Sequence, residues 1–199
     1  MAVQIVSWVA VALVLATSTG LLISRDWRWS LSLLALQYLA AFWLVTLHWP
    51  LGMASVKLVA GWMAIAALGI TRLGITKDES DIESFWPRGL WFRIFLAGIV
   101  TILTAATAPR IETVIPGLGL PVIAGGLLLV GMGMIHLGIT SQIMRVVLGL
   151  LTMLTGFEIV YAAVESSILV AGLIAVVNLG LALAGSYLLM ANSSAEETA

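Results

Sequence analysis

The sequence predicts an all-α membrane protein, a polytopic bundle of about seven transmembrane helices in one domain. The chain of 199 residues is 61% hydrophobic and 10% charged, so it carries more apolar side chains than the core of a soluble domain buries. Its mean hydropathy is +1.13, and apolar runs of about 20 residues, the length that crosses a bilayer, recur along it. We expect a multi-pass protein of the inner (cytoplasmic) cell membrane.

The composition also excludes several classes of function. The formal net charge of −1 offers no basic surface for a nucleic acid. The sequence contains no cysteine, which excludes disulfides, thiolate-bound iron–sulfur clusters and cysteine nucleophiles. It has no phosphate-binding loop, no H-E-x-x-H motif and no hydrolase elbow. We therefore expect no active site, no cofactor and no metal site on this chain itself.

Turn and interfacial residues bound each predicted span. The first span has no lysine or arginine before it, so we interpret it as a retained helix rather than a secretory signal. A turn with two arginines and two interfacial tryptophans precedes the second span, and Pro50 separates the second from the third. Prolines and glycines from Pro109 to Pro121 predict the loop between the fourth and fifth spans. The predicted spans are residues 3–23, 29–49, 51–73, 90–108, 120–139, 142–164 and 168–190.

These spans form a single membrane domain over residues 1–191. Residues 1–108 hold four spans and residues 119–191 hold three, while residues 192–199 form a polar tail that we expect to be disordered. Between the third and fourth spans lies the longest polar stretch, Thr76 to Arg88. In it Ser80 and Glu83 have the spacing of a capping box, which is compatible with a short helix on the membrane surface. A plain solvated loop is the alternative.

The distribution of basic residues predicts the orientation. Loops are expected to hold more lysine and arginine on the cytoplasmic side. The other side has only Arg110 at a loop, so the N-terminus is expected outside and the C-terminus in the cytoplasm. Arg93 is close enough to the end of its span to extend its guanidinium to the surface. The basic residues of the first, third and fifth loops and their margins are Arg25, Arg28, Arg72, Lys77, Arg88, Arg93 and Arg145.

Glycines predict where helices pack closely. The fifth span contains five of them, and the sixth carries Gly149 and Gly156 one heptad apart. In membrane helices such small residues allow two backbones to approach each other. Arg145 opens the sixth span, where a cytoplasmic anchor is the simplest interpretation and a functional cation the alternative.

Glu158 is the most informative single residue, because a carboxylate inside an apolar span costs roughly 2.5 kcal/mol or more. At a rise of about 1.5 Å per residue, Glu158 and Lys57 both lie roughly 9 Å below the outer surface. We therefore expect them to meet as a buried pair, although Lys57 alone has the length to reach the surface. Gln37 and Asn178 are predicted near the midplane, where the alternative role is to hold helices together. His136 is predicted near the cytoplasmic edge.

Carboxylate, amine and imidazole groups joined by amides and water are the parts of a proton relay. The path candidates are therefore Glu158, Lys57, Asn178, His136 and Gln37. Among the spans we find no convincing internal repeat, which disfavours a stand-alone transporter.

The run S-Q-I-M-R-V-V-L-G-L-L-T-M-L from Ser141 to Leu154 resembles the loop and second helix of subunit K of respiratory complex I. It is still more similar to the E-type membrane subunit of the group 4, formate hydrogenlyase-type hydrogenases. That family has about seven helices with a K-like unit at its C-terminal end. Alignment through Arg145 and Gly149 places Leu151 where the K family has its proton-pathway glutamate. Glu158 then follows two turns later on the same face, and Asn178 is nearest in character to the family's second glutamate.

The resemblance implies a non-catalytic membrane-arm subunit of a complex I-like, ion-translocating redox complex. Its partners would be antiporter-like subunits, a subunit that anchors the hydrogenase or quinone site, and the lipid bilayer. The redox centres would lie on those partners, which fits the absence of cysteine. The alternatives are a K-like subunit of a multi-subunit cation/proton antiporter, a structural scaffold and a stand-alone transporter.

Overall fold

The computed structural model describes residues 2–75 and 89–197, and this part of the chain contains seven α-helices and no strand. All seven are long and apolar enough to cross a membrane, which confirms the predicted fold class. The helices are α1 (Ala2–Ile23), α2 (Trp27–Thr46), α3 (Leu51–Gly74), α4 (Leu90–Val114), α5 (Leu120–Ile139), α6 (Ile143–Val164) and α7 (Ile168–Glu197).

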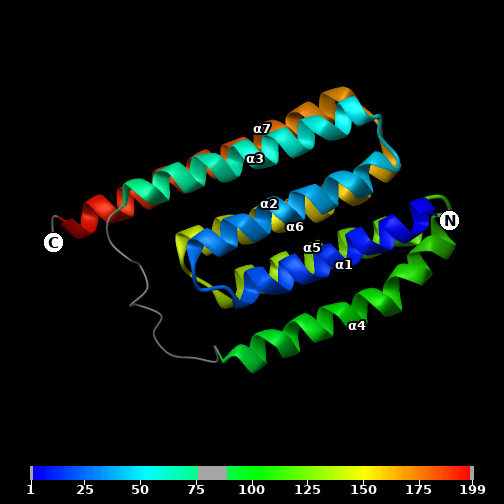
Figure 1. Cartoon of the computed structure of the whole chain (residues 1–199), viewed down its shortest axis with the longest axis horizontal. Coiled ribbons are helices and arrows are strands. Elements are labelled where there is room, and N and C mark those ends of the chain that lie inside the picture. The colour runs from blue at the N-terminus through cyan, green and yellow to red at the C-terminus, as the bar shows by residue number, and fades with distance from the viewer. Residues whose placement is uncertain (1, 76–88, 198–199) are drawn as a thin grey trace.

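The helices pack in two rows (Figure 1). In one row α2 lies between α1 and α3, and in the other α6 lies between α5 and α7. The rows face each other so that α1 contacts α5, α2 contacts α6 and α3 contacts α7. Helix α4 lies at one edge, against α5 and α1.

This arrangement contains a topological repeat. In Figure 1 α1 and α5 begin at the same end of the bundle, as do α3 and α7, while α2 and α6 run the opposite way. The chain is therefore two three-helix units of the same order and direction, α1–α3 and α5–α7, joined by α4. The sequence showed no convincing repeat, and this repeat lies in the order and direction of the helices rather than in similar residues.

Two helices extend beyond their predicted ends. Helix α4 continues through Pro109 to Val114, because a proline removes only one hydrogen bond and the residues after it close further turns, such as Ile115 N–H to Ile111 O at 2.8 Å. The turn into α5 then uses Gly117 and Gly119, both at positive φ.

Helix α7 continues through most of the tail that was predicted to be disordered, ending at Glu197. The hydroxyls of Ser193 and Ser194 both donate to the carbonyl oxygen of Met190 within the helix. The alanine and glutamates that follow have good helix propensity. The polar stretch of residues 76–88, with its predicted capping box, lies outside the described residues.

The closest backbone packing is between α5 and α6. We call it the glycine seam, formed by Gly126 and Gly133 of α5 and Gly149 and Gly156 of α6. A Cβ atom on Gly156 would lie 2.6 Å from the carbonyl oxygen of Gly126, and one on Gly133 would lie 2.7 Å from the backbone nitrogen of Met153. Only hydrogen fits at these two positions, which confirms the close approach predicted from the glycines.

Arg93 does not extend to the surface as predicted. Its side chain is buried, and Nη1 donates a 2.7 Å hydrogen bond to the carbonyl oxygen of Leu22 in the last turn of α1. The last carbonyls of a helix have no partner inside it, and a cation there also interacts favourably with the helix dipole. Arg93 thus fastens the start of α4 to the end of α1.

Candidate functional site

Four helices bring polar side chains together on one side of the bundle, away from α4. On α3, Lys57 belongs to a buried stripe of small residues that includes Ala54, Gly61 and Ala64, at the three- and four-residue spacing of one helix face. On α6, Glu158 follows the equally buried Leu151 and Thr155 on one face. Helical periodicity therefore turns both charged groups inward.

Lys57 and Glu158 form a buried ion pair. The Nζ atom of Lys57 contacts Oε2 of Glu158, and each side chain is only 5% exposed. The other carboxylate oxygen, Oε1, accepts a 2.5 Å hydrogen bond from Nδ2 of Asn178 on α7. The pairing predicted from matched depths is confirmed, and both carboxylate oxygens have a partner from a different helix.

Tyr38 of α2 completes the group. Its hydroxyl donates to Oδ1 of Asn178 at 3.2 Å, and the ammonium of Lys57 lies 5.6 Å from the centre of its ring, within the range of a cation–π contact. We call Lys57, Glu158, Asn178 and Tyr38 the polar cluster. It joins α2 and α3 of the first three-helix unit to α6 and α7 of the second.

In the buried pair, the cost of burying one charge depends on the presence of the other. Taking either ion out of water is costly, and the mutual attraction offsets that cost only while both partners and their hydrogen bonds are present. Removing one partner leaves an uncompensated charge and is destabilising by about 3–5 kcal/mol. A change in the protonation state of either group therefore creates a net charge within the bundle.

Gln37 lies beside the cluster without joining it. It is completely buried, and its Nε2 donates to the hydroxyl of Thr152 on α6 at 3.3 Å. Its own oxygen has no hydrogen-bond partner within the described part of the chain. Gln37 therefore links α2 to α6 at a position next to Tyr38.

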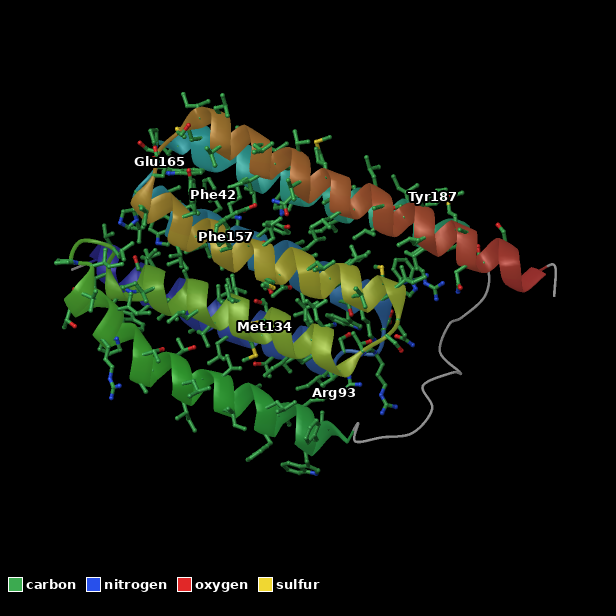
Figure 2. All side chains as sticks on the ribbon, turned by 180° about the vertical axis from the view of Figure 1, so that it is seen from behind. Phe42, Arg93, Met134, Phe157, Glu165 and Tyr187 are labelled. Carbon is green, nitrogen blue, oxygen red and sulfur yellow. The ribbon has the colours of Figure 1, made fainter. Side chains whose placement is uncertain are left out.

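His136 is separate from the cluster. It is buried on α5, where its Cβ packs close to Gly149 of the glycine seam, and Arg93 and Arg145 are its electrostatic neighbours. No contact links it to Lys57 or Glu158 among the interactions the structure describes. Figure 2 places Arg93 and Glu165 at opposite ends of the bundle. His136 has Arg93 as an electrostatic neighbour, whereas Glu158 precedes Glu165 by two helical turns.

Sequence reasoning missed Tyr38. A tyrosine in an apolar span is usual near the membrane surface, whereas Tyr38 lies well inside α2 and is completely buried. The available signal was its position next to Gln37, because two adjacent polar residues near the middle of a span both need partners inside the bundle.

A small cavity of about 10 Å³ adjoins the polar cluster, close to the space that one water molecule requires. Its walls come from the first turns of α3 and α7, together with Trp49 from the turn between α2 and α3. The lining residues are Trp49, Met53, Val56, Lys57, Glu158, Ala171, Ile174, Ala175 and Asn178.

Comparisons of the chain with family models, with curated proteins and with solved structures found no match. Within the described residues no three His, Asp or Glu side chains gather where a metal ion could bind. The polar cluster and its cavity are therefore the features on which a functional proposal rests.

Proposed function

We propose that the chain is a non-catalytic membrane-arm subunit of a complex I-like, group 4 hydrogenase-type redox complex that translocates protons or sodium ions. The observation that carries the proposal is the polar cluster, in which Lys57 and Glu158 form an ion pair within the bundle. Ionisable side chains inside membrane domains mark ion and proton pathways. The chain's role would be to contribute part of such a path and to join neighbouring membrane subunits.

The chemistry of the pair suits this role. A proton that arrives on the Glu158 carboxylate neutralises it and leaves the Lys57 ammonium without its counter-ion. A proton that leaves Lys57 has the converse effect on Glu158. In a medium of low dielectric constant either imbalance is strongly unfavourable, so proton arrival at one group promotes proton release from the other. Asn178 and Tyr38 hold the pair between the two three-helix units.

The resemblance to complex I subunit K adds support, since it falls on the helix that carries Glu158. The matching segment, Ser141 to Leu154, covers the turn before α6 and the first half of α6. Leu151, aligned with the family's glutamate, is completely buried, and Glu158 follows it on the same buried face. The carboxylate of Glu158 would take the role of the family's glutamate on the same helix, two turns closer to the end of that helix.

The test is the Glu158→Gln variant in the assembled complex. Glutamine keeps the size of the side chain but cannot exchange a proton, so redox-driven ion movement into vesicles should fall strongly. Because Lys57 loses its counter-ion and the bundle loses stability, ion movement is measured per assembled complex. Glu165→Gln is the matched control, because Glu165 is an exposed carboxylate at the end of the same helix. Wild-type ion movement in Glu158→Gln would rule out the relay.

A second candidate is a stand-alone transporter, which the topological repeat favours. Parallel repeats are one architecture of transporters, and their substrate and ion sites lie between the repeats. The polar cluster has this location, with Tyr38 and Lys57 from one three-helix unit and Glu158 and Asn178 from the other. Ion or solute flux by the purified chain alone in proteoliposomes would favour this function, and flux only in the presence of co-purifying subunits would favour the first.

A further inference from the structure

We infer that water reaches the polar cluster from one end of the bundle only, through a crevice between the first turns of α3 and α7. The cluster would then exchange protons with a single aqueous phase, on the side where α2 joins α3 and α6 joins α7. This inference rests on the proposed function and deepens it, because it names the side with which the Lys57–Glu158 pair communicates.

The cavity defines the route. Its lining residues lie on α3 from Met53 to Lys57 and on α7 from Ala171 to Asn178, so they connect the first turns of both helices to the ion pair. Ala171 and Ala175 lie one helical turn apart on the α7 wall. Their small side chains leave space that larger residues would fill. At its inner end the cavity meets charged and amide groups, which are the partners that a water molecule needs.

Trp49 lies at the other end of this route. Its indole Nε1 donates a 2.8 Å hydrogen bond to the backbone carbonyl oxygen of Glu165. This bond connects the turn between α2 and α3 to the turn between α6 and α7. Trp49 is itself buried and lines the cavity, so it narrows the crevice and holds the two turns in place.

The opposite direction is closed by buried side chains, which are mostly apolar and include the hydrogen-bonded Gln37 and Thr152. Tyr38 fills the space against Gly61, where a Cβ atom would overlap its ring. Beyond it lies a continuous hydrophobic cluster contributed mainly by the same four helices. Its buried residues are Leu21, Leu31, Leu34, Tyr38, Ala64, Leu68, Met144, Val147, Leu148, Leu151, Ala182 and Leu189. We call this cluster the apolar plug.

The contrast between the two directions is large. Toward the start of α3 and α7 the ion pair faces a cavity, whereas toward their other ends it faces a cluster of buried hydrophobic side chains. Leu34, Ala64, Leu68, Leu151 and Ala182 of the plug have no exposed surface at all. Among the residues that the structure describes, the cavity is therefore the opening toward the ion pair on which the inferred water route rests.

The absence of cysteine from the sequence allows a direct test by thiol labelling. Ala175→Cys places a thiol on the cavity wall, and Ala182→Cys, two turns further on the same face of α7, places one in the apolar plug. Both variants would be studied in the full chain, in its native membrane, with a small charged methanethiosulfonate that does not cross the bilayer. The wild-type chain serves as the blank.

Labelling of the Ala175→Cys variant should occur from one side only. Because modification requires a solvated thiolate, this variant should react on the order of tenfold faster than Ala182→Cys. Reagent added to the side where α2 joins α3 should suffice, which the distribution of basic residues predicts to be the outer side. Ala182→Cys should react only after denaturation in SDS. Ala171→Cys, one turn nearer the opening, is the second variant if Ala175→Cys does not accumulate.

Equal rates for Ala175→Cys and Ala182→Cys would overturn the inference, and so would reaction of Ala175→Cys from the opposite side. Failure of both cavity variants to react in the membrane, when both react in SDS, would do the same. These readouts do not depend on ion movement. One-sided labelling together with normal pumping in Glu158→Gln would leave the water route in place and remove the relay.

Discussion

The two faces of α6 show two different ways of holding membrane helices together. On one face the glycine seam brings α6 against α5 by contact of backbones, and on the other the polar cluster connects α6 to α2, α3 and α7 by charge and hydrogen bonds. Gly156 and Glu158 are close neighbours in the chain, yet they serve different faces. Packing at the glycine seam depends on the size of the side chains, whereas the stability of the polar cluster depends on the balance of its charges.

The largest effect is expected at the seam. In Gly156→Leu the new Cβ would lie 2.6 Å from the Gly126 carbonyl oxygen and 2.7 Å from Cβ of Leu129, and these atoms belong to a helix that cannot move away without losing its other contacts. Overpacking costs about 1–3 kcal/mol even where side chains can adjust, and here the backbone itself would have to move. We expect little or no folded protein, measured as monodisperse material in detergent.

The control for the seam is Gly172→Leu. A Cβ atom on Gly172 of α7 meets nothing within 4 Å, and leucine is a good helix former. This variant should fold like the wild type. A normally folded Gly156→Leu variant would show that the glycine seam tolerates a large side chain. It would contradict the statement that the two faces of α6 differ in their sensitivity to side-chain size.

The next largest effect is expected from Lys57→Met. Methionine has a similar length but no charge, so the Glu158 carboxylate would stay buried without its cation. The expected loss is about 3–5 kcal/mol in free energy of unfolding, measured by SDS-induced unfolding or as a lowered Tm. A loss in free energy of unfolding below about 1 kcal/mol, the range of an exposed ion pair, would mean that the buried pair stabilises the fold no more than a surface ion pair does.

The Lys57→Met/Glu158→Met double variant sharpens this prediction. It removes both charges and leaves apolar side chains of similar volume, a replacement that is often neutral or stabilising for buried pairs. We expect it to regain most of the stability lost in Lys57→Met, measured in the same unfolding experiment. If the losses from the two single variants simply added, the residues would be independent and not a pair.

The smallest effect is expected for Tyr38→Phe. This change removes one 3.2 Å hydrogen bond to Asn178 and keeps the ring that packs against Gly61. Hydrogen bonds between membrane helices contribute about 0.6 kcal/mol on average. A loss of this size in the unfolding experiment would assign Tyr38 a positioning role, whereas one as large as that of Lys57→Met would place it at the centre of the cluster.

The sequence was sufficient to predict the seven helices, because the length and apolar character of each run match the thickness and the apolar interior of a lipid bilayer. It also predicted the Lys57–Glu158 contact, since two opposite charges at equal depth each need a partner. The end of α4 was not predicted, because Pro109 removes one hydrogen bond from a long helix without ending it. The bond from Arg93 to Leu22 depends on which helices are neighbours, which local sequence does not specify.

The parts of the site that were not predicted share this cause. Asn178 was expected as a path residue near the midplane, but its hydrogen bond to Glu158 was not predicted, because it depends on the packing of α6 against α7. His136 was expected as a path residue, which stays a prediction, and its Cβ packs close to Gly149 of the glycine seam. Tyr38 entered the cluster only because α2 lies between the other helices. The depth of a residue along its helix can be estimated from the sequence, whereas the identity of the neighbouring helices cannot.

The central claim is that the chain retains the Lys57–Glu158 pair for ion movement rather than for stability. The most direct measurement is redox-driven ion uptake by vesicles that contain the assembled complex with the Lys57→Met/Glu158→Met variant. We expect a complex that assembles and unfolds much like the wild type but moves few or no ions. A stable double variant with wild-type ion uptake would contradict it and leave the polar cluster as a purely structural joint between the two three-helix units.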